Sequence, residues 1–149
     1  MANIPVFWSR IVTFTALAGL LPFVAGLVLT LMPSLHLLDQ IVFERALVGY
    51  GVLILAFLGG VRWGLRLQGG AGSDLTFVMG IIGSVAGFFM LLMPYTLALI
   101  ILTIGFALQG AWDIWSVGVP QFYSQLRRLM TLLVCVVLVA ILIARFTVS

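Results

Sequence analysis

Residues 75–112 read LTFVMGIIGSVAGFFMLLMPYTLALIILTIGFALQGAW and contain no charged side chain. These 38 residues are interrupted only by Met93-Pro94-Tyr95. Because about 20 helical residues cross a hydrocarbon layer ~30 Å thick, the run predicts two membrane spans joined by a tight turn. A water-soluble helix needs a polar face, which this run does not offer. The chain is therefore predicted to lie in a membrane.

The composition of the whole chain agrees with this prediction. Hydrophobic residues make up 64% of the 149 residues and charged residues 7%, whereas a typical soluble domain is about 25% charged. Spans and short connections use nearly all of this length, so we expect a single membrane domain over residues 1–149. The net charge of +3 is spread over several helix ends, which excludes a nucleic-acid-binding face and favours contact with anionic lipid headgroups.

Charges, prolines and glycines delimit five apolar segments along the chain. These segments cover residues 11–32, 46–65, 75–93, 95–112 and 129–144. Before the last one, Pro120 can open a helix with Phe122, Tyr123 and Leu126 on one stripe, and we predict a short interfacial helix there. The predicted fold is an all-α integral membrane protein, a bundle of five transmembrane helices with this interfacial helix before the last span.

The arginines predict the orientation of the bundle. With five spans, one side of the membrane carries five of the seven basic residues: Arg10, Arg62, Arg66, Arg127 and Arg128. The other side carries only Arg45 and Arg145. The excess of arginine on cytoplasmic loops places the N-terminus in the cytoplasm and the C-terminus outside. All four tryptophans fall on the same predicted cytoplasmic side, which supports this placement.

Glycines recur at helical spacing in two of the segments. Gly60 and Gly64 lie one turn apart in the second span, and Gly80, Gly83 and Gly87 follow one face of the third. Small residues let helix backbones approach closely where lipid removes the hydrophobic drive between helices. We predict that these glycines pack helices together within the monomer; a dimer face and a ligand groove are the alternatives.

Asp113 is the acidic residue attached directly to a span end on the cytoplasmic side. A carboxylate near hydrocarbon is costly unless it has a partner, and we predict Arg62 as that partner, with Arg127 second. Tyr123 lies one turn before Arg127, and Trp63 follows Arg62, so both are expected around the same cluster. Such a cluster is either a structural ion pair or an anion-binding or proton-handling site.

The sequence contains no motif for metal binding or nucleophilic catalysis. His36 is the only histidine, and no second histidine or paired carboxylate stands at metal-ligand spacing. Cys135 is the only cysteine, which excludes an intramolecular disulfide. No serine has a base at a recognisable spacing, and no glycine run has a phosphate-loop pattern. We therefore predict no catalytic residue, no metal site and no cofactor.

One block at the end of the second span is distinctive, FLGGVRWG at residues 57–64. Tyr50 precedes it, and Asp113 and the pattern P-x-x-Y-x-x-L-R-x-x-x-T at residues 120–131 follow it. In these motifs the chain resembles an uncharacterised family of small multi-pass membrane proteins, which includes bacterial inner-membrane members and mitochondrial transmembrane protein 69. The resemblance covers most of the chain from the second span onward and implies five spans, without an activity, substrate or cofactor. The positions that the resemblance singles out are the same as those of the predicted cluster: Arg62, Trp63, Asp113, Tyr123 and Arg127.

Together these observations favour a non-enzymatic protein of the bacterial inner membrane, acting as an accessory, assembly or scaffold component. One alternative is a small transporter or channel, although such a protein needs polar residues along a path at mid-membrane. Another is a protein that binds a lipid or quinone headgroup at the arginine–aspartate cluster. Membrane lipids are the predicted partners, and other membrane proteins or a second copy of the chain are further alternatives.

Overall fold

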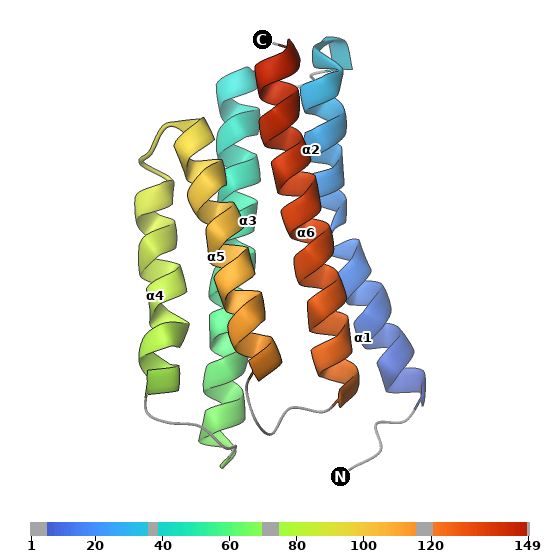
Figure 1. Cartoon of the computed structure of the whole chain (residues 1–149), viewed down its shortest axis with the longest axis vertical. Helices are drawn as coiled ribbons and strands as arrows, with labels where there is room; N and C mark the ends of the chain where they lie inside the picture. Colours follow the sequence, from blue (N-terminus) through green and yellow to red (C-terminus); the bar gives the residue numbers. More distant parts are fainter. Residues whose placement is uncertain (1–5, 36–38, 70–74, 116–120, 149) are drawn as a thin grey trace.

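The computed structural model describes residues 6–35, 39–69, 75–115 and 121–148, and the regular structure among them is entirely helical. The elements are α1 (Val6–Ala18), α2 (Leu21–Leu31), the 3-10 helix η1 (Pro33–Leu35), α3 (Gln40–Leu67), α4 (Leu75–Met90), α5 (Tyr95–Trp115) and α6 (Gln121–Val148). Figure 1 shows the helices aligned along one long axis, with α1 beginning at the lower end and α6 finishing at the upper end. The all-α prediction is confirmed.

The chain runs up and down this axis. α1 and α2 ascend in tandem, α3 descends, α4 ascends, α5 descends and α6 ascends (Figure 1). α4 packs chiefly on α3, α5 packs on α6 and on α3, and α2 packs on α6. Pro94 joins α4 to α5. The lower ends of α3, α5 and α6 therefore meet at one end of the bundle.

The lengths and compositions of the helices fit a membrane. Four segments are long and apolar enough to cross one: Arg10–Leu31, Gln40–Leu67, Tyr95–Ile114 and Gln121–Thr147. The apolar part of α4, Phe77–Met90, is shorter. Large apolar side chains such as Phe14, Leu53 and Leu132 are more than half exposed, as expected for surfaces that lipid covers rather than water. The fold thus has four candidate spans and one shorter apolar helix.

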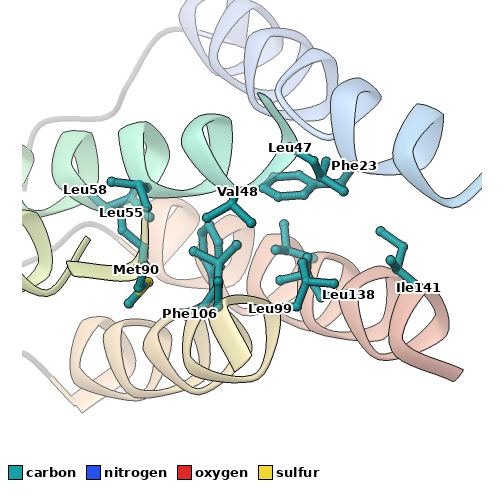
Figure 2. Packing of buried hydrophobic residues seen from close by; sticks show 14 residues of the cluster. Phe23, Leu47, Val48, Leu55, Leu58, Met90, Leu99, Phe106, Leu138 and Ile141 are labelled. Atoms are coloured by element: carbon teal, nitrogen blue, oxygen red, sulfur yellow. The ribbon is translucent and has the colours of Figure 1, made fainter. Parts of the chain in front are cut away.

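The core is a continuous row of apolar side chains from α2, α3, α4, α5 and α6. Figure 2 shows Phe23 of α2 between α3 and α6, with Leu99 and Leu138 close by. Phe23 also meets the ring of Phe106 edge-on, with 5.8 Å between the ring centroids. Among residues 10–18 of α1, by contrast, none is buried. α1 is therefore the least anchored of the helices.

The first predicted span is not one helix but two. Gly19 and Leu20 separate α1 from α2, because Pro22 has no N–H to donate and its ring clashes with the preceding turn. The N–H of Phe23 bonds to the carbonyl of Leu20, and the carbonyl of Gly19 accepts instead from the hydroxyl of Tyr50 at 2.7 Å. Arg10–Leu31 still forms one candidate span, so the span predicted over residues 11–32 is present with a break that was not predicted. Tyr50 holds the break against α3.

The predicted interfacial helix is also absent from the described part of the chain. Residues from Gln121 onward belong to α6, which continues unbroken to Val148; Pro120 lies outside the described residues. The reason is a row of buried side chains at helical spacing that begins with Leu126 and Arg127 and continues into the span. This row keeps the first turns of α6 inside the bundle.

Only part of the predicted glycine packing is present in the structure. Cβ atoms added at Gly80 and Gly87 would overlap Trp63 and Val52 of α3, so the glycine face of α4 does lie against α3. Gly83 is looser, since an added Cβ would be 3.7 Å from the carbonyl oxygen of Leu55. On α3, however, the contact is made by a different glycine from the predicted pair.

Gly60 and Gly64 have nothing within 4 Å of an added Cβ among the described residues, so the prediction that they pack helices was wrong for the monomer. The glycine of α3 that packs against α4 is Gly59, because a Cβ added to it would overlap the carbonyl oxygen of Gly80. Successive residues are turned by about 100° around a helix, and the buried row of α3 includes Leu55, Gly59 and Arg62. Gly60 falls outside this row.

These neighbouring glycines make a matched test of the α3–α4 contact. Gly59→Ala pushes a methyl group into the backbone of α4 and should lower stability by about 1–3 kcal/mol, the usual range for overpacking. Gly60→Ala meets no neighbour and should leave stability unchanged or raise it by up to ~1 kcal/mol through helix propensity. Thermal unfolding in detergent measures both variants. Equal effects at the two positions would contradict this packing.

Candidate functional site

The lower end of the bundle contains one carboxylate held by two arginines. Asp113, in the last turns of α5, is 5% exposed, and Arg62 of α3 and Arg127 of α6 are 7% and 9% exposed. Nε of Arg62 donates to Oδ1 of Asp113 at 2.6 Å, and Nε of Arg127 donates to Oδ2 at 2.7 Å. Nη2 of each arginine lies against the same oxygen as its Nε. We call these three residues the triad.

The triad forms because each member continues the buried face of its own helix. On α5, Asp113 follows the buried side chains of Leu102 and Phe106 at helical spacing. Arg62 ends the buried row of α3, and Arg127 begins that of α6. Since the core already brings these three faces together, their polar ends must meet at the same level.

Two positive charges face one negative charge in this buried place. Removing ions from water is costly, and the attraction offsets that cost only when the geometry is good and the polar atoms are bonded. Here both carboxylate oxygens accept charge-assisted hydrogen bonds from guanidinium groups, which are the strong kind. The triad therefore ties α3, α5 and α6 together and leaves one positive charge in excess among its three members.

Trp112 contacts the triad but was not among the aromatic residues predicted around it. Trp112 places its ring 5.6 Å from the guanidinium carbon of Arg62, a favourable cation–π distance. Tyr123, which was predicted there, is half-buried one turn before Arg127 on α6.

Trp63 turns away from the cluster in which we expected it. Its Nε1 donates to the carbonyl of Phe77 at 2.9 Å, and its ring meets the ring of Phe77 edge-on at 5.1 Å. The side chain lies about 100° around α3 from that of Arg62, so it packs on α4 instead. It supports the α3–α4 contact.

A second charged cluster lies at the upper end of the bundle and was not predicted. Arg145, near the end of α6, pairs with Glu44 in the first turns of α3. The guanidinium carbon of Arg145 also lies 4.8 Å from the ring centroid of Tyr95. The signal was present in the sequence, because Glu44 and Arg145 fall on the same predicted side of the membrane. A cavity of about 380 Å³, which Glu44 and Tyr95 help to line, adjoins this pair.

Another cavity, also of about 380 Å³, adjoins the triad. Its walls come from α1, α2, α3, α5 and α6. Most of the lining is apolar, with Tyr123 and Arg127 as polar residues from successive turns of α6. Thr131 lines it one turn further along, with its hydroxyl turned toward Gly110 of α5. The hydroxyl of Thr131 is buried and has no hydrogen-bond partner among the described residues. Arg127 thus belongs both to the triad and to the cavity wall.

The part of the chain that the structure describes holds no cluster of metal ligands. No group of three or more His, Cys, Asp or Glu side chains comes together there. His36 lies outside the described residues.

These features define a helical bundle with the lengths and surface of a multi-pass membrane protein, locked at one end by a buried arginine–aspartate–arginine cluster. Residues 8–143 match the model of a protein family of unknown function, DUF3429, and the chain belongs to that family. The predicted membership of an uncharacterised family is confirmed, while the relation to mitochondrial transmembrane protein 69 stays a prediction. Comparisons with curated proteins and with solved structures give no match.

The triad predicts how much each of several substitutions lowers the stability of the protein. Asp113→Asn leaves two buried guanidinium groups without their carboxylate and should cost about 3–5 kcal/mol. Arg62→Gln or Arg127→Gln should cost less, because the remaining arginine still neutralises Asp113. Unfolding of the purified protein in detergent, measured by temperature, ranks these variants.

The triple variant Arg62→Gln, Asp113→Asn and Arg127→Gln should recover part of the loss, since no unpaired charge remains. Arg128→Gln, at an exposed neighbouring position, serves as the control and should be close to wild type. If Asp113→Asn were as stable as Arg128→Gln, the triad would not hold the bundle together.

Proposed function

We propose that this protein is a five-span protein of the bacterial inner membrane, with its N-terminus in the cytoplasm and its C-terminus in the periplasm. Its role is that of a non-enzymatic accessory, assembly or scaffold component. Membrane lipids surround it, and a membrane protein or a second copy of the chain is its partner.

The count of five spans depends on α4. Its 16 residues extend about 24 Å, less than the ~30 Å of an average hydrocarbon layer. Short spans are accommodated by local thinning of the bilayer. The side of α4 away from α3 is apolar and exposed at Val78, Ile81, Val85 and Phe88, which favours a helix surrounded by lipid. With α4 as a span, the ends of α1 and α6 fall on opposite sides.

The orientation rests on the arginines. The end of the bundle that contains the triad also carries the larger share of the arginines, and such an end faces the cytoplasm.

The observation that carries the accessory role is the way in which Asp113 is used. Both of its oxygens are bound by arginines from other helices, so the buried charges join helices rather than line a path. A transporter or channel needs polar groups along its route, whereas the charged residues described here gather at the two ends. A bundle whose helices are joined by ion pairs at both ends is suited to be a rigid component on which other proteins assemble.

A second candidate function has its own support. Because Arg127 lines a cavity as well as binding Asp113, the same end of the bundle is suited to hold the headgroup of a lipid or a quinone.

The topology gives the first test. A reporter fused after Ser149 should respond as periplasmic, one inserted at Gly69 as cytoplasmic, and one after Pro94 as periplasmic. Alkaline phosphatase and green fluorescent protein fusions read these sides separately. A cytoplasmic response after both Pro94 and Ser149 would remove α4 from the spans and overturn the five-span count.

The accessory role is tested by purifying the protein in mild detergent from its native membrane. A membrane protein that is recovered in equal molar amounts, and that is lost from the Asp113→Asn variant but kept by Arg128→Gln, supports the role. Recovery of the protein alone, saturated with one lipid or quinone, would favour the headgroup-binding function instead.

A further inference from the structure

We propose that the cavity beside the triad binds one membrane phospholipid with an anionic headgroup. An acyl chain lies in the cavity along α6, and the headgroup lies at Arg127. This site goes beyond the accessory role, and it rests on the membrane placement and orientation proposed above.

The length of the cavity corresponds to one leaflet of a bilayer. On α6 its lining extends from Tyr123 to Val134, a rise of ~16 Å along the helix. Half of a hydrocarbon layer of ~30 Å is about the same length. A chain that entered from the cytoplasmic surface would therefore reach the middle of the membrane, as an acyl chain of that leaflet does.

The walls of the cavity suit such a chain. Val12 of α1, Phe23 of α2, Ile54 of α3 and Phe106 of α5 line it with apolar surface. Its volume of about 380 Å³ is within the range of ~300–1,000 Å³ typical of small-molecule sites. A volume of this size holds one chain rather than a whole lipid, so the rest of the molecule stays in the bilayer.

The polar end of the cavity selects the headgroup. A guanidinium group has five N–H donors, and the contacts of Arg127 with Asp113 use those of Nε and Nη2. Both of these nitrogens lie against one oxygen of Asp113, so the guanidinium group has further N–H donors that can bind a phosphate.

The charge balance favours an anion. The triad has one positive charge in excess, and its predicted side of the membrane carries five arginines against Asp74 and Asp113. Cytoplasmic leaflets are rich in anionic lipids, which positive segments attract.

Native mass spectrometry of the delipidated protein tests the site with dioleoylphosphatidylglycerol as the probe. Wild type should retain one such lipid. Ala16→Phe fills the cavity from α1 and should lower its retention by on the order of tenfold, which corresponds to ~1.4 kcal/mol.

A matched variant controls for side effects. Ala18→Phe adds the same ring to α1 at an exposed position outside the cavity and should retain the lipid as wild type does.

Unchanged retention in Ala16→Phe would overturn the proposal. Equal retention of dioleoylphosphatidylcholine would overturn the recognition of an anionic headgroup, and displacement of the probe by ubiquinone would assign the cavity to a quinone. None of these outcomes changes the reporter topology or the accessory partner. A failure of the lipid site is therefore distinguishable from a failure of the proposed function.

Discussion

The carboxylate of Asp113, buried and bound on both oxygens by arginines, is the constraint on which the lower half of the bundle depends. A charge at this place is tolerated only while its partners are within hydrogen-bond reach. Arg62 and Arg127 come from helices that are distant in sequence, so α3, α5 and α6 must end at one level and turn their buried faces inward. Apolar packing alone is non-directional and tolerates sliding. The triad fixes the register of the three helices.

The same constraint explains why this part of the structure could be predicted from the sequence. A carboxylate at a span end needs a cation at the same depth, and the five-span order leaves few arginines that qualify. Arg62 and Arg127 were therefore the predicted partners of Asp113, and both bind it in the structure. Glu44 and Arg145 obey the same rule at the upper end. That pair was overlooked because its arginine was considered only as a topology signal.

What the sequence did not determine is the rotation of each helix about its own axis. Gly59 and Gly60 are equally small, and only the packing of α3 on α4 decides which of them contacts the neighbouring backbone. The position of the Trp63 side chain was mispredicted for the same reason. Trp63 follows Arg62 directly, so its side chain points about 100° further around α3, toward α4 instead of the triad. The break before α2 is a different case: Pro22 was visible in the sequence, and its effect on a helix is general.

The break and the cavity have a common origin. Because Pro22 interrupts the first span, α1 is not constrained to continue the axis of α2, which Phe23 anchors in the core. Tyr50 holds the carbonyl at the break through one hydrogen bond, and residues 10–18 bury no side chain. α1 is thus a wall that the rest of the bundle supports without packing tightly against it. In a protein otherwise locked by paired charges, the place with the fewest packing restraints is also the place where an apolar chain can enter beside Arg127.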